Sequence, residues 1–218
     1  MEQSLPKGTG NTLSASGSYR GSVRVNAICV LLGWLGITGA IVFISPFLLM
    51  AGGWSPQGTA EFHGYLTLTL VLMVCGFIGL NLRYRKLAGR LFLLATLVAI
   101  GGFAVMMAWY VAEFWFNASI WAELIFLTGI LIALTGSLLL GVSSWHSITL
   151  PQWAKWLFVL APAATIIALI IEALTGASLY PLPLLALCLV SLAAGIVAAR
   201  RTRKPGETSI PATKPPIP

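Results

Sequence analysis

The chain has 218 residues, of which 58% are hydrophobic and only 9% are charged, and its net charge is +7. A water-soluble domain carries roughly 25% charged residues, so this composition excludes a surface that faces water on all sides and favours burial in lipid. All six acidic residues are Glu. The lack of Asp excludes functions that depend on aspartate, such as Asp-based metal-binding loops.

Polar tails flank a long apolar region. Residues 1–25 are rich in Gly, Ser and Thr without apolar periodicity, which predicts a disordered tail. Residues 26–199 hold six apolar runs, each close to the ~20 residues that a helix needs to cross a bilayer. Residues 200–218 return to charge and proline and predict a second disordered tail. We therefore expect an all-α, polytopic membrane helix bundle with six transmembrane helices at about 27–49, 65–82, 91–112, 120–142, 155–173 and 181–199.

The basic residues are confined to one face of this expected topology. All thirteen Lys and Arg residues lie before the first run, between the second and third, between the fourth and fifth, or after the sixth. The loops of the other face, 50–64, 113–119 and 174–180, contain neither Lys nor Arg. The positive-inside rule then predicts a multi-pass protein of the cytoplasmic membrane with both termini in the cytoplasm.

The stretch NLRYRKLAGR, residues 81–90, concentrates these cations between the second and third runs. We interpret it, together with the start of the C-terminal tail, as a topology anchor that pairs with anionic lipid headgroups. The anchor residues are Arg83, Arg85, Lys86, Arg90, Arg200, Arg201, Arg203 and Lys204. The expected partners are the lipid bilayer, anionic headgroups and other membrane proteins. Nucleic acid is not expected, because the topology already accounts for the charge.

A group of acidic residues and one histidine is expected at the opposite face. It consists of Glu61, His63, Glu113, Glu123 and Glu172. Together they would form a ligand-binding mouth for a metal ion, an organic cation or a proton; the alternative is that these interfacial carboxylates are simply solvated. Glu123 and Glu172 are the strongest candidates, because each lies about a turn inside an apolar run, where a carboxylate needs a proton, a partner or a wet cavity.

Small residues and hydroxyls recur within the runs. The segments GWLGITGA (33–40), CGFIG (75–79) and SLAAG (191–195) present small faces that allow close helix approach, and we expect them to pack inside the bundle. Hydroxyls inside a span are expected to bond to carbonyls of the preceding helical turn. They are Thr69, Thr96, Thr128, Thr135, Ser137, Thr165 and Ser191.

Motifs for catalysis are missing from the sequence. There is no G-x-S-x-G, Ser-x-x-Lys, C-x-x-C or Walker lysine, and His63 and His146 are expected on opposite faces of the membrane. No cofactor and no structural metal site are predicted. The sequence therefore does not establish an enzyme, and it favours a function without catalysis.

Two stretches between residues 79 and 160 resemble uncharacterised small bacterial integral membrane proteins with about six spans. GLNLRYRKLAGRLFLLATLVAIGG is similar to a pattern of a short basic loop, A-G-R and a glycine-rich span. GSLLLGVSSWHSITLPQWAKWLFVLAP resembles a glycine-ended span, a short loop with L-P-x-W-A and the next span. This resemblance implies the fold and the membrane location, and it implies no activity.

Three classes of function remain open from the sequence. The first is a non-enzymatic accessory or scaffold protein that binds partners through its spans or basic tails. The second is a small permease or ligand-binding membrane protein that uses the outer glutamates. The third is a lipid-modifying membrane enzyme, which requires a polar cluster that the sequence does not reveal.

Overall fold

The computed structural model describes residues 13–51, 60–85, 89–116, 119–145, 150–176 and 181–200, with side chains for somewhat shorter ranges within them. These residues form six helices, and the described ranges contain no strand. The helices are α1 (Leu13–Ala51), α2 (Ala60–Tyr84), α3 (Arg90–Phe116), α4 (Ser119–Trp145), α5 (Gln152–Thr175) and α6 (Pro181–Ala199). The expectation of an all-α bundle with six helices is therefore confirmed.

Each helix contains a segment that is long and apolar enough to cross a membrane. These segments are Val25–Pro46, Gly64–Tyr84, Arg90–Tyr110, Leu124–Trp145, Gln152–Glu172 and Leu182–Ala199. They match the six predicted spans to within a few residues. Many large apolar side chains on them face outward, as in Leu31, Leu91 and Ile167, which is the surface that a multi-pass membrane protein presents to lipid.

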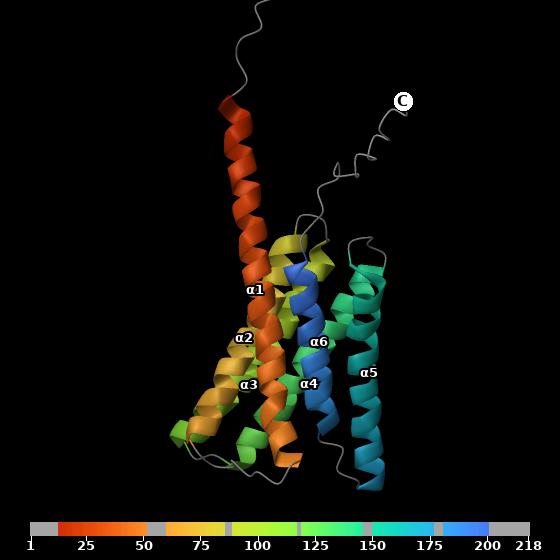
Figure 1. Cartoon of the computed structure of the whole chain (residues 1–218). Helices are drawn as coiled ribbons and strands as arrows, with labels where there is room; N and C mark the ends of the chain where they lie inside the picture. The colour runs from red at the N-terminus through yellow and green to blue at the C-terminus, as the bar shows by residue number, and fades with distance from the viewer. Residues whose placement is uncertain are drawn as a thin grey trace, which may run out of the picture.

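The helix α1 begins at Leu13, inside the segment 1–25 that we expected to be a disordered tail. Its first part extends beyond the ends of the other helices (Figure 1). A physical reason is that adding a residue to an existing helix gains one hydrogen bond, whereas only the start of a new helix carries the large entropic cost. The prediction of disorder used only the Ser- and Gly-rich composition of these residues. It did not consider that the helix of the following span can extend into them.

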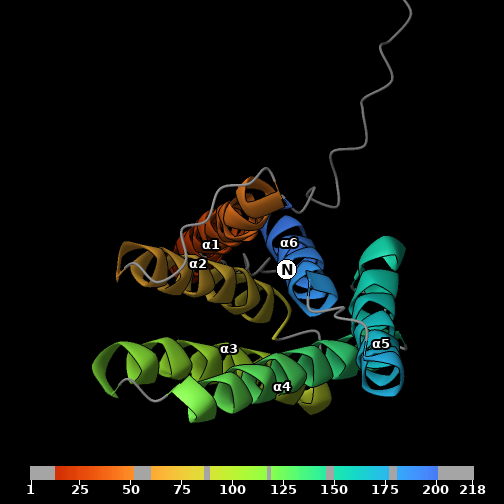
Figure 2. The same ribbon diagram turned by 90° about the horizontal axis from the view of Figure 1, so that it is seen from below.

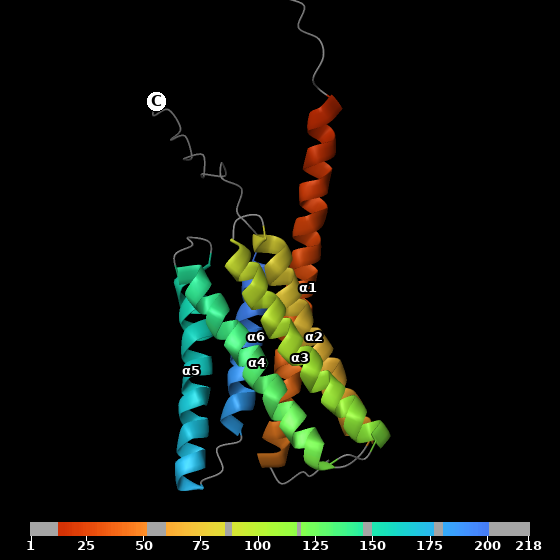
Figure 3. The ribbon, with the colours of Figure 1, turned by 180° about the vertical axis from the view of Figure 1, so that it is seen from behind.

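The six helices fall into two groups joined by α5. Seen from below, α1, α2 and α6 lie together, α3 and α4 run beside each other, and α5 packs against α4 and α6 (Figure 2). The view from behind shows α3 in front of α2 and α4 in front of α6 (Figure 3). The start of α1 and the end of α6 lie at the same end of the bundle (Figure 1), as an even number of passes requires.

Glycines bring the backbones of α1, α2 and α6 into direct contact. A Cβ atom placed on Gly36 would lie 2.5 Å from the Cα of Gly76, and one on Gly195 would lie 2.8 Å from the carbonyl oxygen of Gly33. Only glycine, which has no side chain, fits at such a crossing. The three small-residue segments predicted from the sequence therefore pack inside the bundle, against one another.

The pair α3 and α4 is closed in the same way. A Cβ atom on Gly102 would lie 2.6 Å from the Cα of Ala133. Between the two groups of helices, Phe77 of α2 and Phe103 of α3 are fully buried with ring centroids 5.5 Å apart. Apolar side chains therefore fill the contact between the groups.

Hydroxyls within the spans bond to their own helices, as expected. Thr69 donates to the carbonyl three residues earlier at 2.8 Å. Thr96, Thr128, Ser137 and Thr165 each donate to the carbonyl four residues earlier at 2.7–3.0 Å. The side-chain oxygen of Ser191 on α6 differs from these five, because it is buried and bonds to none of the residues that the structure describes. No such bond is recorded for Thr135, so the expectation for that residue stays a prediction.

A proline in α1 creates a polar contact with α2. Pro46 has no N–H, so the carbonyl of Val42, four residues earlier, lacks its usual helical partner. Ser45 Oγ donates to that carbonyl at 2.8 Å, and the hydroxyl of Tyr65 on α2 donates to it as well. The two hydroxyls also lie 2.8 Å apart. The freed carbonyl thus becomes a hydrogen-bonded link between two helices.

Candidate functional site: a basic groove between α1, α2 and α6

Every Lys or Arg whose side chain the structure describes lies at one end of the bundle, which we call the basic end. It comprises Arg83, Arg85, Arg90, Lys155 and Arg200. These residues lie where α2 and α6 end and where α3 and α5 begin, the end at which α1 also starts (Figure 1). Four of the eight predicted anchor residues are thus brought together here. The side chains of the other four, Lys86, Arg201, Arg203 and Lys204, lie outside the described residues.

Arg83 connects the end of α2 to the end of α6. Its Nη1 donates a 2.7 Å hydrogen bond to the carbonyl oxygen of Ala198. This carbonyl belongs to the last turn of α6, where a cation also interacts favourably with the helix dipole. The guanidinium carbon lies 6.0 Å from the ring centroid of Tyr84. The Nε–H of Arg83 is buried, and no described residue accepts a hydrogen bond from it.

Arg200 follows directly on α6. Its guanidinium carbon lies 5.5 Å from the ring centroid of Trp153 on α5, within the range of a cation–π contact. Its backbone N–H donates to the carbonyl of Ile196 at 3.1 Å, which extends the helical hydrogen bonding by one residue. Arg200 therefore stands at the end of α6, next to both Arg83 and α5.

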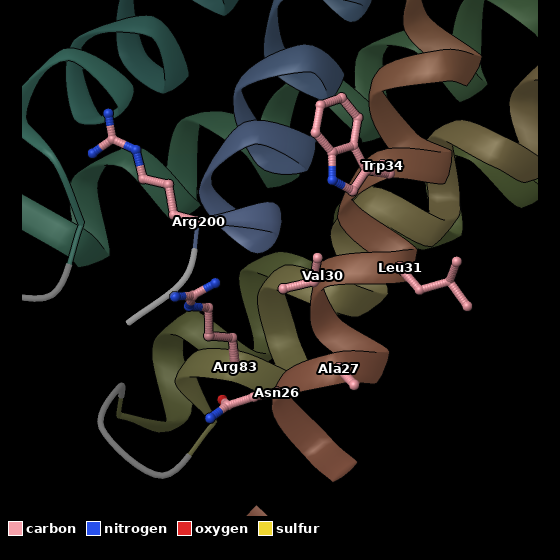
Figure 4. Close-up of a pocket in the computed structure, with 7 residues that line it drawn as sticks. All are labelled: Asn26, Ala27, Val30, Leu31, Trp34, Arg83 and Arg200. Carbon is pink, nitrogen blue, oxygen red and sulfur yellow. The ribbon is translucent and has the colours of Figure 1, made fainter. Parts of the chain in front are cut away.

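A groove of about 490 Å³ opens between these arginines and the first turns of the α1 span. Its lining residues are Asn26, Ala27, Val30, Leu31, Trp34, Arg83 and Arg200 (Figure 4). Asn26, Val30 and Trp34 follow one another at a spacing of four residues, so they share one face of α1. The groove is therefore polar at its basic end and apolar towards Trp34.

A second groove of about 410 Å³ lies between the end of α2 and the start of α3. It is lined by Asn81, Arg85, Gly89, Arg90 and Leu93. The carbonyl of Gly89 accepts the first hydrogen bond of α3, from the N–H of Phe92 at 3.1 Å. Four of these lining residues belong to the stretch NLRYRKLAGR, and none of the five comes from α1 or α6.

The predicted acidic mouth falls largely outside the described side chains. Four of its members lie in helices by their backbones, but their side chains lie outside the described residues: Glu61, His63, Glu113 and Glu123. His146 also lies outside the described residues. Glu172 is described, is half-buried near the end of α5, and lines neither groove. Within the described residues, no three His, Cys, Asp or Glu side chains are grouped to hold a metal ion.

Both arginines of the first groove were predicted from the sequence as anchor residues, but the groove itself was not predicted. Asn26 and Trp34 were not among the residues predicted to form a site. The available signal was the four-residue spacing of Asn26, Val30 and Trp34, which places an amide, a valine and an indole on one helix face. Nothing in the sequence indicated that α2 and α6 would both end opposite that face.

The fold and the groove define an all-α, six-helix protein of the multi-pass membrane class. Comparison of the chain with known protein families, with curated proteins and with solved structures returned no match.

Proposed function

We propose that the chain is a non-enzymatic accessory or scaffold protein of the cytoplasmic membrane, with the basic end and both termini in the cytoplasm. The proposed orientation rests on the gathering of Arg83, Arg85, Arg90, Lys155 and Arg200 at one end, which the positive-inside rule assigns to the cytoplasm. In this role the protein binds other membrane proteins through its outward-facing helix surfaces.

The observation that carries this proposal is the close packing of the helices at the contacts that the structure describes. Gly36 and Gly76 bring α1 and α2 into backbone contact, Gly102 does the same for α3 and α4, and the Phe77–Phe103 pair fills the contact between the two groups. A carrier of polar solutes needs an internal site lined by polar groups. Four buried hydroxyls inside the spans instead bond to their own helices, which supports a structural role for them: Thr69, Thr96, Ser137 and Thr165.

The permease alternative depends on the acidic residues at the other end. It requires a cavity that reaches Glu172 from between the helices, and neither of the two grooves of the basic end does so. The enzyme alternative requires a Glu, His and hydroxyl cluster, which no observation on the described side chains favours. Partner binding needs neither feature, which is why it is the function we propose.

The proposal can be tested by photo-crosslinking in cells. A photoreactive amino acid is placed, one position at a time, at an outward-facing residue of each helix. Suitable exposed positions are Ile41, Leu68, Leu97, Leu131, Ile170 and Leu185, with the buried Leu134 as a control. A scaffold should give one discrete protein adduct from adjacent positions on one face and none from Leu134. If all six exposed positions yield only lipid adducts, partner binding through the spans is contradicted.

A further inference from the structure

We propose that the groove between α1, α2 and α6 binds one anionic phospholipid, with its phosphate on Arg83 and Arg200 and an acyl chain along Val30, Leu31 and Trp34. This inference goes beyond the scaffold role and does not depend on it. It also differs from general attraction of headgroups to the basic loop, because it assigns a single lipid to a defined groove.

The polar end of the groove matches a phosphate group. Arg83 uses one of its five N–H donors on the Ala198 carbonyl, and its buried Nε–H has no acceptor among the described residues. The other N–H groups of this guanidinium can donate charge-assisted hydrogen bonds to the oxygens of a phosphate in the groove. Arg200 supplies a second guanidinium and Asn26 an amide at the same groove. Because the described lining holds two cations and no carboxylate, a negatively charged headgroup is favoured.

The apolar wall of the groove excludes a simple anion as the complete ligand. Asn26 and Trp34 are eight residues apart, which corresponds to about 12 Å along the helix. Asn26 is therefore expected at the depth of the headgroups, and Trp34 within the hydrocarbon layer. Leu31 and Trp34 are 60% and 59% exposed, so this wall is open to an acyl chain from the surrounding bilayer. Figure 4 shows Asn26 and Arg83 towards one end of the groove and Trp34 towards the other, with Arg200 on the side of the groove across from α1.

The protein already holds the two arginines in place. Arg83 is fixed by its hydrogen bond to α6, and Arg200 lies over Trp153 of α5. A site whose cations are ordered beforehand loses less side-chain entropy when a ligand binds. A bound lipid would contact α1, α2 and α6 together, so it would also stabilise the end of this three-helix group.

The experiment is a lipid titration of the purified full-length chain in mild detergent, followed by native mass spectrometry. The probes are phosphatidylglycerol and phosphatidylcholine with identical acyl chains. Both lipids carry a phosphate, but phosphatidylcholine also carries a trimethylammonium cation that the two arginines repel. We therefore expect one phosphatidylglycerol to bind about tenfold more tightly than phosphatidylcholine. The substitutions Arg83→Gln and Arg200→Gln should each weaken phosphatidylglycerol binding about tenfold and leave phosphatidylcholine nearly unchanged.

Two further variants keep the test decisive. Ala27→Trp fills the groove without removing charge and should weaken phosphatidylglycerol binding even if Arg83→Gln fails to fold. Arg90→Gln removes one cation from the second groove and should leave the bound lipid in place. Equal binding of both lipids, or an equal loss in Arg90→Gln and Arg200→Gln, would contradict the site. The site would also be contradicted if the groove bound inorganic phosphate or a polypeptide in place of lipid and the substitution Ala27→Trp removed that binding.

Discussion

Gly36 of α1 and Gly76 of α2 meet so closely that a Cβ atom on Gly36 would lie 2.5 Å from the Cα of its partner. Gly195 of α6 lies beside both of them. Lipid chains are as apolar as the side chains of these helices, so helix association in a membrane depends on such close packing more than on the hydrophobic effect. This crossing is therefore where the stability of the α1, α2 and α6 group should be most sensitive to substitution.

The first prediction concerns this crossing. Gly36→Ala should lower the free energy of unfolding by about 1–3 kcal/mol, because the new methyl group meets backbone atoms that cannot move aside cheaply. Thermal unfolding of the purified protein in detergent measures the change. Gly64→Ala on α2 is the matched control, because a Cβ atom there would meet nothing within 4 Å. Equal stability of the two variants would show that the crossing is looser than described.

The second prediction uses two neighbouring glycines on α3. A Cβ atom on Gly102 would lie 2.6 Å from the Cα of Ala133 on α4, whereas one on Gly101 would meet nothing within 4 Å. Gly102→Ala should therefore destabilise the protein by about 1–3 kcal/mol. Gly101→Ala should be neutral or stabilising by up to about 1 kcal/mol, because alanine favours the helix. Chemical unfolding in mixed micelles compares the two, and the reverse order of stability would refute the α3–α4 packing.

The third prediction concerns the proline-linked contact between α1 and α2. Tyr65→Phe removes a hydroxyl that donates to the Val42 carbonyl and should cost about 0.5–1.5 kcal/mol. Pro46→Ala restores a backbone N–H that can donate to the same carbonyl. In the Pro46→Ala background, Tyr65→Phe should therefore cost clearly less. A double-mutant cycle on unfolding free energies measures this coupling, and an unchanged cost in both backgrounds would disprove the explanation.

The sequence predicted the spans and the small-residue segments because both are properties of a single helix. Each apolar run must fold as a helix to satisfy its own backbone in lipid, so its position is readable from composition alone. The segments 33–40, 75–79 and 191–195 indicated close approach, and the structure confirms it. The hydroxyl bonds of Thr96 and Thr165 were predictable for the same reason, since donor and acceptor lie on one helix.

Which helices contact one another could not be predicted from the sequence. A glycine indicates that something lies close but not which helix supplies it, so nothing predicted that Gly36 would meet Gly76. The groove required three helices to place Asn26, Arg83 and Arg200 around one space, and each residue alone resembles an ordinary interfacial residue. The expectation was wrong for Ser191, which lies buried on α6 without the bond to its own helix that Thr96 and Thr165 make.

The proposed topology has six passes with the basic end in the cytoplasm. Cysteine accessibility in intact cells tests this topology most directly. In a background with Cys29, Cys75 and Cys188 replaced by Ala, single cysteines are introduced as Gly89→Cys at the basic end and Thr175→Cys at the other end. Both positions are exposed. A membrane-impermeant maleimide should label Thr175→Cys in intact cells and Gly89→Cys only after permeabilisation. Labelling of Gly89→Cys in intact cells would contradict the account.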